Sequence, residues 1–330
     1  MADVIITVDL GGTRLRAARL DTSMNILQRT ETLTKAHEGK EATLQRMKDI
    51  IREVLPTDGS KVVGIGVSAA GPTNPKTGVL VAPPNLDGWH DVPVADILYA
   101  EFGVPVYVGN DANVAALAEA SVGGAKGTRD SIYLTVSTGI GSGIISDGRL
   151  VLGKEGIGGE AGHVILVVDN GRVSTLEKEG AGPALARHAR ARLAAGEKSI
   201  LTEMAQGNLD TIDSKMIGTA ANNGDALALS VVEYGAKIVG LGIVSLLLLF
   251  NPEVVVIGGG VSYIGDIWFA KVRETVKEYA LDDNYWKDTP IIASNMSEDV
   301  GILGAATLVV TEGGRKRVTK IASRMKADEG

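Results

Sequence analysis

The sequence predicts a two-lobed α/β protein. Its 330 residues exceed the usual length of one domain. A run of strands followed by alternating strands and helices occurs twice along the chain, as expected for two α/β lobes with a cleft between them. We place a small lobe over 1–111 and a large lobe over 112–330, and the C-terminal helix is a candidate to join the small lobe.

The first round begins with strands expected over 4–9, 15–20 and 26–34, because turn residues separate these apolar runs. A helix follows, in which apolar residues from Leu44 to Leu55 fall on one face at helical spacing. The round continues with these elements: a strand over 62–67, a Pro/Gly/Asn-rich loop ending at Trp89, a helix over 94–102, a strand over 104–108 and an Ala-rich helix over 113–121.

The second round starts with strands over 131–136 and 143–146, and Asp147-Gly148 is typical of a hairpin turn. Alternation of helices and strands then resumes. The expected elements are a strand over 163–168, helices over 183–195, 198–206, 214–222 and 226–250, a strand over 254–257, a helix over 267–279, a strand over 291–293 and a helix over 304–310.

Composition excludes several classes of function. A net charge of −7 argues against nucleic acid as a partner, because phosphate neutralisation needs a basic surface. The chain has no cysteine, so disulfides and thiolate zinc sites are excluded. We expect a cytoplasmic protein without a membrane partner, since no signal peptide is visible and the apolar stretch 238–250 is shorter than the about 20 residues that span a bilayer. The basic segment 315–326 fits a solvated helix or a docking site for an acidic partner.

Three glycine-rich turns follow apolar strands: Asp9–Thr13, Ser137–Gly143 and Gly258–Gly260. Glycine lets backbone N–H groups approach an anion closely, so such turns can bind phosphate. A glycine pair alone is more often a tight turn. The first turn has better flanks, because Asp9 can face a metal ion and Thr13 can offer a hydroxyl to a phosphate. No P-loop or complete G-x-G-x-x-G motif occurs.

Polar residues cluster in four further segments: 84–89, 110–113, 158–163 and 176–177. A carboxylate and two amides at a strand end, as in Asn110-Asp111-Ala112-Asn113, can bind sugar hydroxyls, and the carboxylate can accept a proton. The alternative for Asn110 and Asp111 is a helix N-cap. Asn85 and His163 have structural alternatives too, as loop packing and as an isolated histidine at a strand start.

Taken in order, these motifs resemble the ROK family of sugar kinases, most closely its bacterial and archaeal glucokinases. The resemblance runs from about residue 4 to about residue 310. It implies the two-lobed actin-like/hexokinase-like ATPase fold, with duplicated ribonuclease-H-like domains. It also implies ATP and Mg²⁺ as cofactors, a sugar as substrate, and a homo-oligomer, either a dimer or a tetramer.

The resemblance assigns a role to each motif residue. Asp111 is the general base, and Asp9 orients Mg²⁺ through water. The sugar ligands are Gly71, Asn85, Asn110, Asp111, Glu160, His163 and Glu177. The ATP-binding residues are Asp9, Gly11, Gly12, Thr13, Thr138, Gly139, Gly259 and Gly260.

The sequence departs from the family pattern at 169–175, where most members carry a cysteine-rich zinc motif. We therefore expect no structural zinc. The shorter segment must be held by a turn at Asn170-Gly171 and by packing of Val173. His163 is then available to bond a sugar hydroxyl directly.

The predicted function is ATP-dependent phosphorylation of a hexose, with glucose converted to glucose 6-phosphate. The sequence leaves N-acetylmannosamine, N-acetylglucosamine, mannose, fructose and allose open as alternative substrates. It does not separate such similar sugars, because epimers, for example, differ by one hydroxyl. A sugar-responsive repressor or another non-catalytic sugar-binding protein is a more remote alternative. The chain starts directly at its first strand, where family repressors carry a helix-turn-helix, and it retains Asp9 and Asp111.

Overall fold

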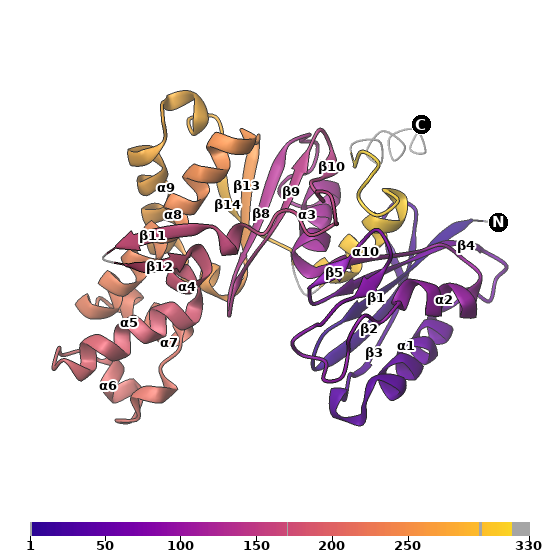
Figure 1. The fold of residues 1–330 in the computed structure, drawn as a ribbon, viewed down its shortest axis with the longest axis horizontal. Helices are drawn as coiled ribbons and strands as arrows, with labels where there is room; N and C mark the ends of the chain where they lie inside the picture. The colour runs from indigo at the N-terminus through magenta and orange to yellow at the C-terminus, as the bar shows by residue number, and fades with distance from the viewer. Residues whose placement is uncertain (1, 170, 297–298, 319–330) are drawn as a thin grey trace. The chain divides into compact units, whose positions relative to one another are not determined.

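The fold, seen in a computed structural model that describes residues 2–169, 171–296 and 299–318, is built on two five-stranded sheets (Figure 1). Their strand orders are β3-β2-β1-β4-β7 and β10-β9-β8-β13-β14. When the strands of each sheet are numbered 1 to 5 in chain order, both sheets have the order 3-2-1-4-5. The second sheet therefore repeats the strand order of the first. The two predicted rounds of strands and the α/β class are confirmed. Two hairpins, β5-β6 and β11-β12, form separate two-stranded sheets.

The strands of the first sheet and the first hairpin are β1 Asp3–Leu10, β2 Arg14–Asp21, β3 Ile26–Leu33, β4 Lys61–Ala69, β5 Thr73–Asn74, β6 Val79–Leu80 and β7 Val106–Asn110. The later strands are β8 Ser131–Val136, β9 Ile140–Ser146, β10 Arg149–Leu150, β11 Ile165–Asp169, β12 Arg172–Thr175, β13 Val254–Gly258 and β14 Ile291–Ala293.

The α-helices are α1 Lys40–Val54, α2 Val94–Phe102, α3 Asp111–Val122, α4 Leu176–Gly180, α5 Gly182–Ala194, α6 Leu201–Met204, α7 Ser214–Asn222, α8 Ala226–Phe250, α9 Asp266–Tyr279 and α10 Val300–Val310. Short 3-10 turns are η1 Ala36–Glu38, η2 Ala161–His163, η3 Leu209–Thr211, η4 Gly260–Ile264 and η5 Asp283–Tyr285.

Helices cover both faces of the first sheet. One face buries Ile6, Val8, Ile65 and Val67 against α1 and α2 in one apolar cluster. Alternation along each strand turns the intervening residues to the other face, where α10 packs. Glycine makes that approach close, because a Cβ at Gly66 would lie 1.9 Å from the α10 backbone. The functional residues of this sheet are therefore held by a backbone buried on both faces.

The chain divides into two compact units. Unit 1 comprises Met1–Ser131, Gly143–Gly159 and Asn295–Gly330, and unit 2 comprises Ile132–Ser142 and Glu160–Ser294. Helix α10 thus belongs to the unit that contains the first sheet. The expected lobe boundary after residue 111 stays a prediction.

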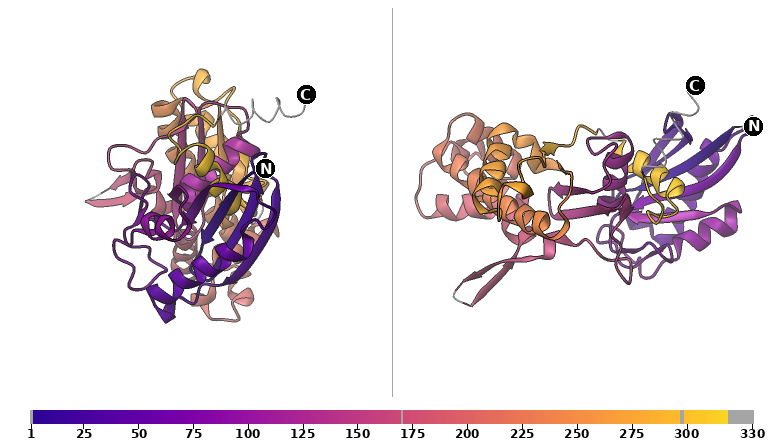
Figure 2. Two further views of the ribbon diagram at one scale, coloured as in Figure 1. Left: turned by 90° about the vertical axis from the view of Figure 1, so that its right-hand side faces the viewer. Right: turned by 90° about the horizontal axis from the view of Figure 1, so that it is seen from above.

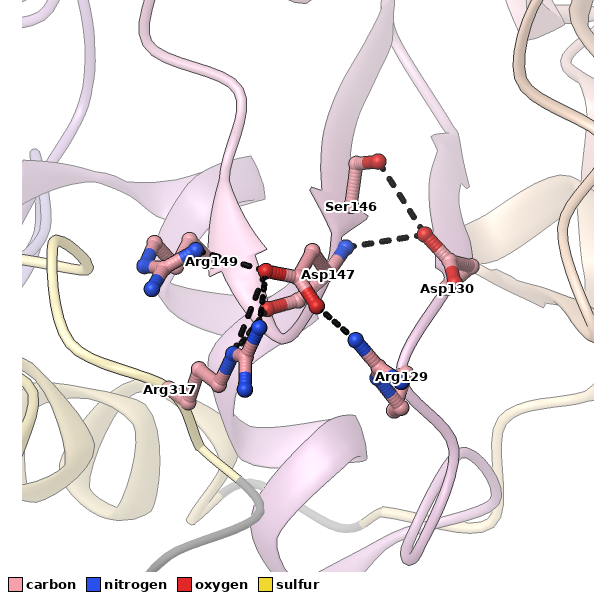
Figure 3. Close-up of polar contacts among 6 residues, drawn as sticks. All are labelled: Arg129, Asp130, Ser146, Asp147, Arg149 and Arg317. Atoms are coloured by element: carbon pink, nitrogen blue, oxygen red, sulfur yellow. Dashed lines mark hydrogen bonds and ion pairs between the residues drawn. The ribbon is translucent and has the colours of Figure 1, made fainter.

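A charged cluster in unit 1 fastens the segment that follows α10 (Figure 3). Asp147, in the β9–β10 turn, accepts hydrogen bonds from Arg149 at 2.7 Å and from Arg317 Nε at 3.1 Å, and it also pairs with Arg129. Its backbone N–H donates to Asp130 at 2.9 Å. Bonds from Arg317 and Arg129 hold the pKa of Asp147 well below its usual range. The carboxylate therefore stays ionised and joins three separate segments.

Several predicted elements differ from those observed. The strand expected over 163–168 begins at Ile165, because residues 161–163 form the η2 turn. The helix expected over 198–206 is reduced to the four residues of α6. The strand expected over 104–108 is shifted to 106–110, and α3 begins at Asp111. Of the segments singled out in the sequence, Asn170 and residues 319–326 of the basic tail lie outside the described residues.

Helix α8 is, by length and composition, apolar enough to cross a membrane, and 67% of its most apolar window is buried within the protein. It packs against four other helices, α4, α5, α7 and α9. Burial in the core accounts for its composition, as expected for the apolar stretch 238–250.

Candidate functional site

The parallel strands of unit 1 bring three predicted site residues to one sheet edge. β1 pairs with β4 and β4 with β7, and the register aligns Leu10 with Ala69 and Ala69 with Asn110. The carboxyl ends of these strands therefore meet, which is where ligands bind in open α/β sheets. Asp9 lies at the end of β1, and Asn110 and Asp111 lie where β7 passes into α3.

Asp9 is held from two sides. Its Oδ2 lies 2.5 Å from the Nη2 atom of Arg16, the residue opposite it on β2. On the other side, Gly301 in the first turn of α10 packs so closely that a Cβ there would lie 2.6 Å from the Asp9 carboxyl carbon. Asp9 also lines a pocket of about 480 Å³ together with Gly11, Thr13, Arg14, Arg16 and Val300. The first glycine-rich turn thus forms one wall of an open surface pocket.

Asn110 and Asp111 combine the two roles that the sequence left open. The Asn110 side chain accepts a hydrogen bond from the Asn113 N–H at 2.7 Å, so it does cap α3. Asp111 is the first residue of that helix, and its side chain reaches the surface. Surrounding protein displaces water from its carboxyl and raises its pKa; a bond from the Ala112 N–H opposes this, and the charge of Asp9 adds to the rise. A carboxylate with a raised pKa is a stronger base.

Two further sugar-site candidates pack against this edge. A Cβ on Gly12 would lie 2.8 Å from the Cβ of Asn85, so the first glycine-rich turn rests directly on the loop that carries Asn85. The Cβ position of Gly71 is 3.6 Å from the Cβ of Asn110. Unit 1 thus brings together Asp9, Gly12, Gly71, Asn85, Asn110 and Asp111, which the sequence assigned to two substrates.

In unit 2, the second glycine-rich turn is braced by Glu177. The Ile140 N–H donates to Glu177 Oε2 at 2.8 Å, and a Cβ on Gly139 would lie 2.5 Å from that same oxygen. The Gly182 N–H donates to the Ser137 carbonyl at 2.8 Å. Glu177, predicted as a sugar ligand, therefore also supports the turn predicted to bind phosphate.

A pocket of about 360 Å³ adjoins this turn in unit 2. It is lined by Ser137, Thr138, Gly182, Pro183, Ala186, Arg190, Ile212, Asp213, Ser214 and Gly260. Thr138 and Gly260 were predicted as ATP ligands. The neighbouring Gly259 has a φ of 89° and lies so close to β8 that a Cβ would meet the Val136 carbonyl at 2.5 Å, so only glycine fits there.

Sequence analysis missed Arg190 and Ser214 as pocket residues. Arg190 is held in place by hydrogen bonds from Nη2 to the carbonyls of Asp210 and Ile212, at 2.6 and 2.7 Å. The sequence signal that could have identified Arg190 is its position on the predicted helix, about two turns after Gly182. Without the fold, nothing in the sequence connects that helix to the segment around Ser214.

Glu160 precedes the η2 turn of unit 2 and His163 is its last residue, and both are exposed. The turn is fixed by its backbone, because the Ala161 N–H donates to Ser142 Oγ at 3.1 Å. A Cβ on Gly162 would lie 2.0 Å from the Ile140 carbonyl. Both side chains are therefore carried on a segment that packs directly on the second glycine-rich turn.

The prediction that Val173 packing holds the segment 169–175 is wrong, because Val173 is 58% exposed. The segment forms the β11–β12 hairpin, which stands out from the helices of unit 2 (Figure 2, right). Its buried anchor is Glu179, which accepts hydrogen bonds from Ser174 Oγ at 2.5 Å and from the Tyr234 hydroxyl at 3.0 Å, and which pairs with Arg172.

Burial by itself raises the pKa of Glu179, but hydrogen bonds from Ser174, Arg172 and Tyr234 outweigh it and lower the pKa to about 2. The carboxylate is thus ionised at neutral pH although its side chain is only 2% exposed. Glu179 lies on α4, and its bonds to Ser174 and Tyr234 connect the β11–β12 hairpin to α8. Because Glu177 lies on the same short helix, this network also fixes the residue that braces the second glycine-rich turn.

Comparison with known proteins places the chain in a family. The pattern of the ROK family matches residues 5–312. The chain belongs to the ROK family. It is 33% identical over 310 residues to a glucokinase of Thermotoga maritima, a match that covers 92% of this chain and 96% of that protein.

Solved structures of the ROK family agree. A ROK hexokinase from Thermus thermophilus superposes with a TM-score of 0.79 at 32% identity, covering 94% of this chain and 98% of that one. A ROK glucokinase from Streptomyces griseus, in complex with glucose and AMPPNP, gives a TM-score of 0.73 at 31% identity, with 92% and 98% covered. The actin-like/hexokinase-like ATPase fold and the predicted resemblance are confirmed.

The roles of individual ROK-motif residues stay predictions. The same holds for the expected absence of zinc. Among the described residues, no three His, Cys, Asp or Glu side chains gather as metal ligands. The hairpin in which we expected no structural zinc is anchored by Glu179 and its bonding partners.

We expect the substitution Glu179→Gln to lower the free energy of unfolding by about 3 kcal/mol at pH 7, because it removes a buried paired charge. The folded pKa lies below the ordinary value of 4.5. The stability from this carboxylate is therefore present above about pH 4.5 and is lost as the pH falls toward 2.

Urea unfolding of both proteins between pH 3 and 7 measures this difference. Glu203→Gln, at an exposed site on α6, is the matched control. A difference between wild type and Glu179→Gln that does not shrink on acidification would contradict the assignment.

Proposed function

We propose that this ROK-family protein transfers the terminal phosphoryl group of ATP to a hexose, and that the hexose is glucose, which becomes glucose 6-phosphate. The observation that carries the proposal is the sheet edge of unit 1, where the Asp9–Thr13 turn follows β1 and Asp111 follows β7, the two parallel strands on either side of β4. The similarity to proteins named glucokinase supports it.

Asp111 would act as general base. As the sugar hydroxyl oxygen attacks the terminal phosphorus, its proton passes to the Asp111 carboxylate, the bond to the bridging oxygen breaks, and ADP leaves. The raised pKa of Asp111 suits this role, since it strengthens the base. The sugar hydroxyls would be oriented by Gly71, Asn85, Asn110, Glu160, His163 and Glu177.

The donor's phosphates would be bound by backbone N–H groups of Gly11 and Gly12, by the Thr13 hydroxyl, and by Thr138 and Gly139. Gly259 and Gly260 would lie close to the adenosine. The pocket that contains Thr138 and Arg190 has the size and mixed polarity for a nucleoside. Phosphoryl transfer depends on such positioning and on charge neutralisation more than on covalent chemistry.

Asp9 fits a role toward Mg²⁺, because carboxylate oxygens suit this ion and it is usually bound with several waters. Arg16 occupies Oδ2, so Oδ1 is the oxygen that Asp9 would direct to a metal-bound water. When bound, the ion would neutralise charge on the donor's phosphates.

The remaining assignments belong to the same proposal. The alternative substrates are N-acetylmannosamine, N-acetylglucosamine, mannose, fructose and allose. We place the protein in the cytoplasm, in glycolytic carbohydrate metabolism, as a homo-oligomer without nucleic acid or membrane as a partner.

An ADP-release assay with a panel of sugars tests the proposal. We expect turnover with glucose, ATP and Mg²⁺, at least tenfold higher kcat/KM for glucose than for N-acetylmannosamine, N-acetylglucosamine, mannose, fructose or allose, and loss of turnover in EDTA that Mg²⁺ alone restores. A preference for another sugar would change the substrate assignment. Absence of sugar-dependent turnover across the panel would overturn the proposal.

We expect Asp111→Asn to lower kcat by about 10²–10⁴-fold, because the amide cannot accept the proton, while glucose affinity measured by calorimetry stays within a few-fold. In wild type, the raised pKa of Asp111 means that activity falls on acidification at a higher pH than an ordinary aspartate would give.

The matched control is Asp266→Asn, which makes the same change at the first residue of α9. Full activity in Asp111→Asn, or an equal loss in the control, would show that Asp111 is only a helix-terminal residue.

A further inference from the structure

A pocket of about 610 Å³ lies in unit 2 between helix α9 and strand β14. It is lined by residues of α9 between 270 and 277 and by residues between 286 and 292, which lead into β14, and we call it the α9–β14 groove. Its volume is in the range of small-molecule sites. Strands β13 and β14 are parallel, so the start of β14 lies at the opposite end of this pair from Gly259 and Gly260, which follow β13. The groove is therefore separate from the candidate nucleotide pocket.

Much of the lining of the α9–β14 groove is apolar. It includes Ala270, Pro290 and Ile292, and the Trp286 indole forms part of the wall. The other tryptophans of the chain are at most 1% exposed, whereas Trp286 is only partly buried. An aromatic side chain that is left partly uncovered in an apolar hollow offers contact area to a ligand with an apolar body.

The groove also carries positive charge that the protein does not neutralise. Three cations line it, Arg273, Lys277 and Lys287, against the single carboxylate of Glu274. Glu274 Oε1 lies 2.9 Å from Lys271 Nζ, so this carboxylate already has a partner. Neither Lys277 nor Lys287 forms an ion pair with any residue that the structure describes. The groove is thus positive on a chain whose net charge is −7, which favours an anionic ligand.

Two of the cations are placed by neighbouring groups. Arg273 donates from Nε and Nη2 to the Ile291 carbonyl, at 3.1 and 2.8 Å, and its guanidinium lies 5.4 Å from the centre of the Phe269 ring. Lys277 Nζ lies 5.6 Å from the centre of the Trp286 ring. Positive charge therefore lies directly beside the apolar wall, and a ligand that combines an apolar body with an anion can contact both.

We propose that the α9–β14 groove binds an amphipathic organic anion. The flat apolar body of this ligand packs against Trp286 and Ile292, and its oxyanion group, a carboxylate, sulfonate or phosphate, lies near Lys277 and Lys287. This site is independent of the proposed phosphoryl transfer, because none of its residues belongs to the candidate sugar or ATP site.

Two fluorescent probes test the proposal, anilinonaphthalene sulfonate and phenylnaphthylamine. They share an apolar body, but only the first carries an anionic group. We expect the wild type to bind the sulfonate more tightly than the amine at low salt. Added salt should weaken only the sulfonate, because ionic screening acts on charge.

In the double variant Lys277→Gln/Lys287→Gln, affinity for the sulfonate should fall about tenfold, the usual scale for losing a charge-assisted hydrogen bond, while affinity for the amine stays unchanged. Ala270→Trp places a large side chain in the groove and should weaken both probes. The matched control is Lys126→Gln/Lys198→Gln, which removes two exposed lysines elsewhere and should bind both probes like wild type. Thermal unfolding shows whether each variant is folded.

Unchanged sulfonate affinity in the folded groove double variant would overturn the proposal, and so would an equal loss in the control, which indicates non-specific attraction. Unchanged binding of both probes in Ala270→Trp would overturn it as well, because the probes would then bind elsewhere. If Ala270→Trp does not fold, Trp286→Ala is the deciding variant and should weaken both probes. A groove covered by a second copy of the chain would bind the sulfonate only after dilution to monomers, and that result would also overturn the proposal.

The groove variants should keep the sugar-dependent turnover of wild type. A wild type that shows no such turnover but binds the sulfonate as expected refutes only the proposed function. A wild type that turns over sugar but whose groove variants bind the sulfonate normally refutes only this inference.

Discussion

The parallel alignment of β1, β4 and β7 is the constraint on which the unit 1 site depends. Because the three strands pair in register, their carboxyl ends meet, and residues far apart in sequence become neighbours. Asp9 comes from the first of these strands and Asn110 from the last. Helices on both faces bury the sheet, so its edge is a rigid support for chemistry that needs fixed positions.

Glycine then decides how closely the functional segments approach one another. Gly12 lets the first turn rest on Asn85, Gly139 lets the second turn rest on Glu177, and Gly301 lets α10 reach Asp9. A side chain at any of these positions would push apart groups that the proposed reaction needs together. The turns that we propose to bind phosphate therefore also serve as packing surfaces for the residues beside them.

Much of this could be predicted from the sequence, because the signals were local. Apolar runs predicted the strands of both sheets except the two-residue β10, and the motif order predicted the ROK fold. What could not be predicted depends on long-range pairing. In the sequence, Glu179 is one more charged residue on a short helix, and its hydrogen bond from the Tyr234 hydroxyl depends on the fold. Arg190 likewise reaches the pocket only through helix packing. Val173 misled because a β-branched residue in a two-stranded hairpin can face solvent.

The most direct test of the account is a crystal structure with glucose and a non-hydrolysable ATP analogue bound together. The account predicts the reacting sugar hydroxyl within hydrogen-bond distance of the Asp111 carboxylate, about 2.6–3.2 Å. It also predicts the terminal phosphate against the backbone of Gly11 and Gly12. A sugar bound in the protein without contact to Asp111, or phosphates bound away from that turn, would contradict it.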